Sequence, residues 1–456
     1  MEDKEKKAIL PHYNNVKYWS VGKEKFKKEV QSFKDFNNIF FNGQYTFFNE
    51  LEESHPEEAA EFMKVYKYLK ELALNLEDNL EKSYDLLLKE TTEELKLTRK
   101  QVALIFLLSF FDIIPPESEI QTDNSIKKHD FIVSSILTHR SGACFQFGRC
   151  FVNYLTVIGN WLKNDVKELD EVIIFQRKNI SDNDYIHDLE KIGKFCNVEI
   201  NEKDSMFDGD ATFYVDFANK YIGGGILSGG AVQEEIFFGV CTEAIVSIFF
   251  MEVMNDNDSI RIDNLIQYSD YTGYGSSFKF TKNKINYDDI RLKRYNIIAI
   301  DAVCFPDINN KISIQRDLHK AYVGFSFVND IEDHLQKTIA TGNWGCGAFG
   351  GDFELKFLQQ WLAATLCHVD KLYYYTFNNK KMKEVVANYE KIRKEMKPID
   401  VYNILMKVPL TAGQVLDKVL NPPPIPKNPT INLTDIDGEG EEDHKNNKCC
   451  PHCCIY

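Results

Sequence analysis

Two kinds of hydrophobic periodicity divide the chain. Up to about residue 130, apolar residues recur every three or four positions, as in residues 57–74, and this spacing predicts amphipathic helices. The run from 102 to 111 is apolar on nearly every side and predicts a buried helix, which Pro115 and Pro116 should end. We therefore expect a mostly helical region in the first 130 residues.

From about residue 170 the pattern changes to short β-rich runs separated by turns or helical stretches. The predicted strands are 172–176, 212–217, 260–267, 295–302 and 371–377. The predicted helices are 234–254, 354–367 and 382–395. Strands rich in β-branched residues that alternate with helices favour an α/β fold with a largely parallel or mixed sheet. Ligands of such sheets usually bind at loops beyond the C-terminal ends of the strands.

Composition indicates a globular protein without general affinity for nucleic acid. The 456 residues exceed one ordinary core, and 44% of them are hydrophobic, which supplies ample material for burial. The net charge of −15 argues against general affinity for DNA or RNA, which depends on clustered Lys and Arg. An anionic ligand is still possible, because oriented backbone N–H groups bind phosphate without a basic surface.

The cysteines and the N-terminal sequence predict a soluble protein of the nucleus or cytoplasm. Seven of the eleven cysteines are scattered among apolar neighbours, as is typical of free thiols in a reducing compartment. The charged N-terminus lacks the apolar core of a secretion signal, and the apolar run 102–114 is too short to span a bilayer. We expect no membrane span.

The composition changes again after Leu420. Residues 421–426 are proline-rich, an acidic stretch follows, and the chain ends in Cys-Cys-Pro-His-Cys-Cys-Ile-Tyr. Low hydrophobicity predicts a disordered tail with incidental thiols. A zinc site would lack a second half-site, and a lipidation motif of the CaaX type would carry an atypical final Tyr456.

The stretch most informative about chemistry is residues 215–235, VDFANKYIGGGILSGGAVQEE. The glycines at 223–225 free the backbone for positive φ and for close approach to a ligand, and their N–H groups can point at a diphosphate or ribose. Glu234 and Glu235 follow, and adjacent carboxylates raise the pKa of one of them. An acid beside a phosphate-binding loop indicates chemistry on a nucleotide-like sugar.

This block resembles the signature of the larger, eukaryotic type of poly(ADP-ribose) glycohydrolase. Two more blocks fit the same family in the same order, QYSDYTGY at 267–274 and ATGNWGCGAFGGD at 340–352. The resemblance covers roughly residues 95–410. It implies a macrodomain-like mixed sheet flanked by helices, with a helical accessory region at 1–130 and a catalytic domain at 131–420. The composition, not the resemblance, places the tail at 421–456.

The resemblance implies that the catalytic residues are Glu235, Glu234 and Asp216. Glu235 would be the general acid that protonates the 2′-oxygen of the ribose–ribose link and then deprotonates water. Glu234 would hold a hydroxyl of the leaving ribose. Two alternatives from the residues themselves stay open: Glu235 as a first-turn helix carboxylate favoured by the helix dipole, and Asp216 as an acceptor in a turn.

The same resemblance implies a set of substrate-binding residues. Asn219 and Gln233 suit ribose hydroxyls, Tyr274 and Phe377 would stack on adenine, and Phe349 would pack against the distal ribose. The glycine-rich loop would face the diphosphate with its N–H groups. The full predicted set is Asn219, Gly223, Gly224, Gly225, Gln233, Tyr274, Asn343, Trp344, Gly345, Cys346, Gly347, Ala348, Phe349 and Phe377.

We therefore expect a glycosidase that trims poly(ADP-ribose) on modified proteins to ADP-ribose, with a role in the DNA damage response. It would act as a monomer, without a metal or other cofactor and without direct DNA binding. Cys346, which has no nearby His in sequence, is expected to be structural rather than nucleophilic. The rivals are a non-catalytic macrodomain that binds ADP-ribose, which has no need of Glu234 and Glu235, and a hydrolase of mono-ADP-ribose.

Overall fold

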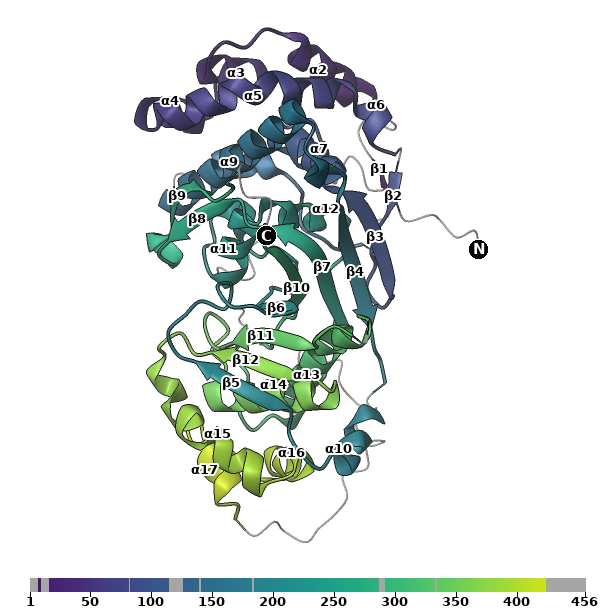
Figure 1. Ribbon diagram of the computed structural model, residues 1–456, viewed down its shortest axis with the longest axis vertical. Helices are drawn as coiled ribbons and strands as arrows, with labels where there is room; N and C mark the ends of the chain where they lie inside the picture. Colours follow the sequence, from purple (N-terminus) through teal and green to yellow (C-terminus); the bar gives the residue numbers. More distant parts are fainter. Residues whose placement is uncertain are drawn as a thin grey trace, which may run out of the picture. The chain divides into compact units, whose positions relative to one another are not determined.

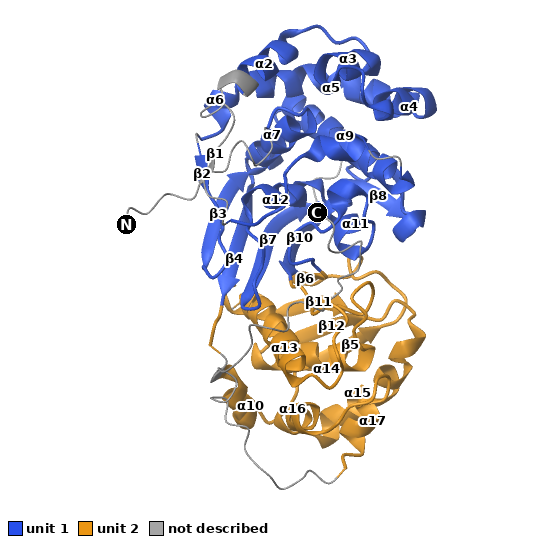
Figure 2. Ribbon diagram, turned by 180° about the vertical axis from the view of Figure 1, so that it is seen from behind, with its two compact units in different colours: residues 1–179, 218–299 blue, residues 180–217, 300–456 orange. Residues whose placement is uncertain are grey.

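The computed structural model describes residues 7–9, 16–81, 83–114, 126–138, 141–182, 184–286, 292–332 and 334–423. The tail beyond residue 423, and with it the terminal cysteines, lies outside the described residues. The chain forms two compact units, coloured separately in Figure 2. Unit 1 comprises residues 1–179 and 218–299, and unit 2 comprises residues 180–217 and 300–456. The expected boundaries at 130 and 420 do not coincide with this division and stay a prediction.

The first part of unit 1 is mainly helical, as the periodicity predicts (Figure 1). Helix α5 (Pro56–Leu74) packs on the long helix α9 (Gly142–Asn164). The other helices of this part are α2 (Val16–Lys27), α3 (Phe33–Phe41), α4 (Thr46–Ser54), α6 (Leu76–Asn79) and α7 (Arg99–Phe110). A cluster of Phe rings, including Phe36, Phe40 and Phe111, fills the space between them. Aromatic rings dominate this core because each buries a large apolar area.

Residues 102–110 of helix α7 are all buried, which confirms the prediction from the all-round apolar pattern. Its predicted end was wrong. The helix ends at Phe110, and Asp112 follows in the left-handed conformation with φ of 57°. The N–H of Ile113 then donates to the carbonyl of Leu108 at 2.8 Å. Such a left-handed residue closes a helix without proline.

Four strands of unit 1 run antiparallel in the order β3 (Glu93–Thr98), β4 (Val172–Asn179), β7 (Asp258–Ile266) and β10 (Arg294–Ala299). Three of them match predicted strands. Strand β3 falls in the region that we expected to be helical, so that expectation was wrong for residues 93–98. Outside this sheet, β1 (Lys7–Ile9) pairs with β2 (Ser83–Asp85), and β8 (Ser269–Thr272) pairs with β9 (Lys279–Asn283).

The predicted helix 234–254 is broken in three. Helix α11 (Gln233–Val240) is followed by a 3₁₀ turn, η5 (Thr242–Val246), and by α12 (Ser247–Phe250). The break lies at Cys241, whose φ and ψ are −104° and 63°. There the N–H of Tyr268, a residue distant in sequence, donates to the carbonyl of Val240 at 2.8 Å. Tertiary contacts thus override a helical pattern.

Unit 2 holds four parallel strands in the order β6 (Phe213–Asp216), β11 (Thr338–Gly342), β12 (Lys371–Tyr375) and β5 (Asn197–Asn201). Strands β6 and β12 match the predictions, whereas β5 and β11 were missed. Helix α14 (Phe353–Leu366) covers this sheet through a ring contact between Phe357 and Tyr374 at 5.1 Å. The remaining helices are α10 (Asp188–Lys191), α13 (Lys311–Phe325), α15 (Lys383–Glu395), α16 (Pro398–Lys407) and α17 (Val415–Leu420). Together the two units confirm a mixed α/β sheet flanked by helices.

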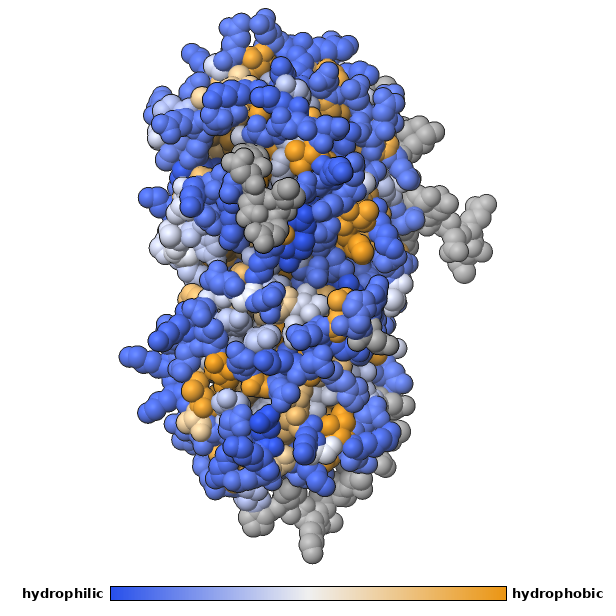
Figure 3. All heavy atoms as spheres, viewed as in Figure 1, coloured by the Kyte–Doolittle hydropathy of each residue, from blue (hydrophilic) through white to orange (hydrophobic). Residues whose placement is uncertain are grey.

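The face shown in Figure 3 is mostly hydrophilic, with small separate groups of hydrophobic residues. This surface agrees with the net charge of −15. Within the described residues, no helix combines the length and the apolar character needed to cross a membrane.

Candidate active site

The loop that follows β6 folds onto the two adjacent glutamates of helix α11. Glu234 accepts two main-chain hydrogen bonds, from Asn219 to Oε2 at 2.8 Å and from Gly223 to Oε1 at 2.7 Å. Its side chain is buried. The two bonds span residues 219–223, so Glu234 fixes the loop itself, a role that the sequence-based interpretation did not include.

Glu235 is held in the same manner one residue further on. Its Oε1 accepts the N–H of Gly225 at 2.9 Å, and its Oε2 accepts the N–H of Val232 at 2.9 Å. Burial raises the pKa of the Glu235 carboxyl, although these main-chain N–H groups oppose the rise. The side chain is only 6% exposed. A buried carboxyl with a raised pKa holds its proton to higher pH than an ordinary glutamate, as a general acid requires.

The N–H groups of Gly223, Gly224 and Gly225 are used inside the loop. Those of Gly223 and Gly225 donate to the two glutamates, and that of Gly224 donates to the carbonyl of Tyr221 at 3.1 Å. Our expectation that they point at a diphosphate or ribose was therefore wrong. Glycine is needed for another reason. At Gly224, φ is 51°, and a Cβ would lie 2.5 Å from Glu234 and 2.6 Å from Glu235.

The second sequence block brings Tyr274 to the same loop within unit 1. The N–H of the next residue, Gly275, donates to the carbonyl of Ala231 at 2.8 Å. Desolvation raises the pKa of Tyr274, the charge of Glu235 raises it further, and a hydrogen bond with the main chain of Gln233 opposes the rise. The phenol thus lies near the predicted acid. Its side chain is 50% exposed, so the ring can still meet a ligand.

Asn219 closes the start of the loop, because its Oδ1 accepts the N–H of Tyr221 at 3.0 Å. The N-terminal end of helix α9 packs against the turn at Gly229. A Cβ on Gly229 would lie 2.5 Å from Sγ of Cys144 and 2.8 Å from Oγ of Ser141. Asn153 of the same helix donates to the carbonyl of Tyr268 at 2.8 Å, at the start of the block that carries Tyr274. Sequence spacing gave no indication of this support.

In unit 2, three predicted segments lie at one edge of the parallel strands. Asp216 ends β6, residues 343–349 follow β11, and Phe377 follows β12, where β6, β11 and β12 are neighbours. The side chain of Asn343 donates to the carbonyl of Thr376 at 3.0 Å and joins two of these segments. Asp216 is buried, with 1% of its surface exposed. These three segments therefore meet at the C-terminal edge of neighbouring parallel strands, where ligands of α/β sheets usually bind.

The loop 343–349 offers main-chain donors that the first loop lacks. The N–H groups of Gly345, Gly347, Ala348 and Phe349 donate to no acceptor among the described residues. Gly345 has φ of 70°, and a Cβ there would lie 2.7 Å from Ala302. Successive unused N–H groups on a glycine-rich loop form a concave anion-binding surface. The geometry therefore supports this loop, rather than the first, as the diphosphate site.

Two residues of this loop have buried side chains. The Trp344 side chain is 1% exposed, its Nε1 donates to the carbonyl of Ile300 at 2.8 Å, and its main-chain N–H donates to Gly342. Cys346 is also buried, and burial raises its thiol pKa to about 12. Their inclusion in the predicted contact set stays a prediction. The high pKa agrees with the expectation that Cys346 is not a nucleophile.

One exposed aromatic residue was missed by the sequence interpretation. Phe305 is 55% exposed and has φ of 48°. Its N–H donates to the carbonyl of Phe349 at 2.7 Å. Pro306 follows Phe305, and a residue before proline normally adopts an extended backbone, so the left-handed conformation is not expected from the sequence.

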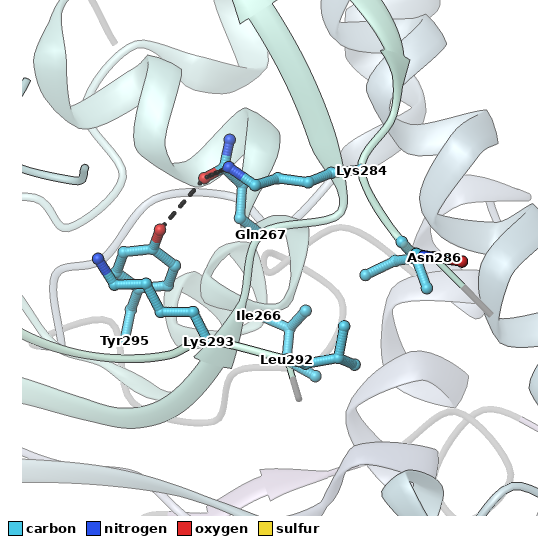
Figure 4. Close-up of a pocket in the computed structure, with 8 residues that line it drawn as sticks. Ile266, Gln267, Lys284, Asn286, Leu292, Lys293 and Tyr295 are labelled. Carbon is cyan, nitrogen blue, oxygen red and sulfur yellow. Dashed lines mark hydrogen bonds between the residues drawn. The ribbon is translucent and has the colours of Figure 1, made fainter. Parts of the chain in front are cut away.

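A cavity of about 210 Å³ elsewhere in unit 1 contains none of the predicted site residues (Figure 4). Its polar groups bond mainly to one another, since Oε1 of Gln267 accepts from Lys284 at 2.9 Å and from the Tyr295 hydroxyl at 3.3 Å. Among the residues that the structure describes, no group of three or more His, Cys, Asp or Glu side chains is arranged to hold a metal ion.

Comparison with known proteins identifies the family of this chain. A family model described as poly(ADP-ribose) glycohydrolase, macro domain fold, matches residues 186–384, and one for the helical domain of the same enzymes matches residues 54–177. Probable poly(ADP-ribose) glycohydrolase 2 of Arabidopsis thaliana is 30% identical over 410 residues, covering 73% of this chain and 75% of the plant protein. Poly(ADP-ribose) glycohydrolase 1 of that plant is 28% identical over 368 residues.

The latter alignment covers 65% of each protein, so the chain spans slightly less than two thirds of that relative. A solved structure of the Deinococcus radiodurans enzyme in complex with ADP-ribose is 14% identical and covers 48% of this chain and 94% of its own, with a TM-score of 0.30. A similarity this low supports no conclusion of its own. From the two family models and the 30% identity to the second plant protein, the chain belongs to the poly(ADP-ribose) glycohydrolase family.

Proposed function

We propose that this protein hydrolyses the ribose–ribose bonds of poly(ADP-ribose) and releases ADP-ribose, with Glu235 as general acid and base. The observation that carries the proposal is the Glu235 carboxyl, which is buried, has a raised pKa and is bonded to the main chain of Gly225 and Val232. Cleavage of a glycosidic bond needs such a protonated group at the leaving oxygen.

In this mechanism Glu235 donates its proton to the 2′-oxygen as the bond to C1″ breaks. The resulting carboxylate then takes a proton from the attacking water, so the acid is regenerated. Glu234 is assigned no proton transfer in this mechanism; its two oxygens accept the main-chain N–H groups of Asn219 and Gly223. It keeps residues 219–223 in place, and a bond to a ribose hydroxyl remains a proposal.

The oxocarbenium-like centre carries developing positive charge, which a nearby anion stabilises. We propose that the substrate's own diphosphate is this anion, held by the main-chain N–H groups of Gly345, Gly347, Ala348 and Phe349. Tyr274 and Phe377, which are 50% and 66% exposed, have faces available for adenine. Asp216 is retained as a catalytic residue on the family resemblance.

A glutamine at position 235 tests the acid. The Glu235→Gln variant keeps the side-chain length but cannot donate a proton to the leaving oxygen, so the hydrolysis rate should fall about 10²–10⁴-fold. ADP-ribose should still bind, measured by calorimetry. The matched control is Glu354→Gln, because Glu354 is also a buried first-turn carboxyl whose pKa burial raises, and it accepts the N–H of Leu416 at 2.9 Å.

Retained turnover in Glu235→Gln would remove the acid assignment. An equal loss in Glu354→Gln would show that any buried carboxyl in this protein is needed for folding rather than for chemistry. Release of ADP-ribose from automodified polymerase, compared with release from a mono-ADP-ribosylated protein, separates the proposed activity from its rivals. A binding module releases nothing from either substrate, and a mono-ADP-ribosyl hydrolase acts on the second.

We also propose that the partner of this protein is poly(ADP-ribose) on modified proteins, and that it works as a monomer without contacting DNA directly. The net charge of −15 supports the last point. A nuclear or cytoplasmic location, expected from the scattered cysteines, and a role in the DNA damage response, expected from the family resemblance, stay predictions. Fractionation of cells that express a tagged form checks the location.

A further inference from the structure

Phe305 combines exposure with a strained backbone. Nine non-glycine residues of the described part of the chain have positive φ, and only two of these, Phe305 and Phe377, are apolar. A bulky side chain in the left-handed region is unfavourable. Such conformations persist where the surrounding structure fixes them, and they cluster at sites that bind ligands.

The surrounding structure does fix Phe305 against the second glycine-rich loop. Its N–H donates to the carbonyl of Phe349 at 2.7 Å. Its ring lies over Gly350, where φ is 68° and a Cβ would lie 2.8 Å from Cδ1 of the ring. The contact continues at Ala302, whose Cβ lies 2.7 Å from the position of a Cβ on Gly345. Residues 302–305 therefore follow the loop along its length.

Buried ion pairs fix the segment 302–305 at its start. Asp301 pairs with Arg316 at 2.5 Å and with Lys320 at 2.8 Å. Asp317 accepts the N–H of Val303 at 3.0 Å and pairs with Lys356. The Nζ of Lys356 also lies 4.2 Å from the ring centre of Trp344 in the loop. Breaking a buried charge pair is costly, so the segment and the loop are held in one fixed arrangement.

Exposed aromatic rings are rare in this molecule. Among the described residues, only Tyr274, Phe305 and Phe377 are large aromatic side chains that are exposed by half or more. Two of them lie at opposite ends of the loop 343–349. Phe377 follows Thr376, which is bonded to Asn343, and Phe305 is bonded to Phe349. A ring at each end of a row of main-chain donors suits a nucleoside diphosphate.

We propose that Phe305 is a substrate-binding residue, whose exposed face packs against a base or ribose of the ADP-ribose unit held by the loop 343–349. This assignment rests on the proposed function. Stacking on an aromatic face contributes measurably to nucleotide affinity and tolerates different ring partners. The strained backbone keeps the ring out of the core and in contact with the ligand.

The test separates the effect of losing the aromatic ring from the effect of the strained backbone. Phe305→Asn removes the ring, and asparagine is among the residues that adopt positive φ readily, so the variant should fold at least as well as the parent. Phe305→Tyr keeps the aromatic face. We expect ADP-ribose to bind about 5- to 100-fold more weakly to Phe305→Asn and within about twofold of the parent to Phe305→Tyr, measured by calorimetry.

The matched control is Leu335→Asn, because Leu335 is 45% exposed and precedes strand β11, whereas the loop follows it. Its affinity should be unchanged, and the thermal midpoints of all variants show that they are folded. Unchanged ADP-ribose affinity in a folded Phe305→Asn would overturn the assignment, as would equal weakening in Phe305→Tyr. If the parent protein itself does not bind ADP-ribose, the proposed function fails instead.

Discussion

Replacing Gly224 with alanine should disrupt the predicted acid without touching either glutamate. Gly224 has φ of 51°, and an alanine in the left-handed region costs about 1–2 kcal/mol relative to glycine. The new Cβ would lie 2.5 Å from Oε2 of Glu234 and 2.6 Å from Oε1 of Glu235. Real Cβ atoms do not approach so closely, so at least one carboxylate must move.

Each carboxylate is held by two main-chain N–H groups, from Asn219 and Gly223 in one case and from Gly225 and Val232 in the other. A hydrogen bond to a charged group contributes about 1.5–3 kcal/mol. Loss of one such bond, added to the backbone strain, gives a decrease in the free energy of unfolding of about 3–5 kcal/mol. Displacing the acid should also lower the rate of ADP-ribose release by about 10²-fold or more.

The matched control is Gly413→Ala. Gly413 has φ of 70°, and nothing lies within 4 Å of the position of its Cβ, so this variant carries the backbone strain alone. Its unfolding free energy should fall by about 1–2 kcal/mol and its activity should not change. Urea unfolding and polymer hydrolysis measure the two effects. If Gly224→Ala is as stable and as active as Gly413→Ala, the loop does not hold the glutamates as described.

Two further predictions concern buried ions and pH. Arg99 and Glu243 form a fully buried ion pair, and the Tyr268 hydroxyl donates to Glu243 at 2.6 Å. Arg99→Ala should lower the unfolding free energy by about 3–5 kcal/mol, because it leaves the Glu243 charge buried without its partner. Arg99→Met combined with Glu243→Leu removes both charges and should recover part of the loss. Urea unfolding of the two variants checks this, and equal losses in both would contradict it. Burial raises the pKa of Glu235. At a pH between the ordinary and the raised pKa, the native state therefore binds more protons than the unfolded chain. The free energy of unfolding should fall as the pH rises through this window. Activity should fall above the raised pKa of Glu235. The stability slope should become shallower in Glu235→Gln, although part of it should remain because burial also raises the pKa of Glu354 and Asp263; an unchanged slope would refute the assignment.

The sequence determined those features that depend on neighbours along the chain. Helix α5 and the buried helix α7 follow from apolar spacing, and β4, β7 and β12 from runs of β-favouring residues. The glycines, Glu234 and Glu235 also form a local unit, since the bonds that join them span at most 15 residues. Their grouping could therefore be predicted from their order alone.

The tertiary structure decided what distant residues do to one another. It assigned the amides of Gly223 and Gly225 to the glutamates, and it left the amides of the loop 343–349 without an acceptor among the described residues. It also broke the predicted helix at Cys241, where a strand end supplies the donor to Val240. Phe305 had no signal in the sequence, because its left-handed backbone contradicts the preference of a residue before proline and is imposed by Phe349 and Gly350. Local conformational preferences amount to about 1 kcal/mol, and hydrogen bonds and close contacts between segments far apart in sequence outweigh them. Those long-range contacts arise only when the chain is folded.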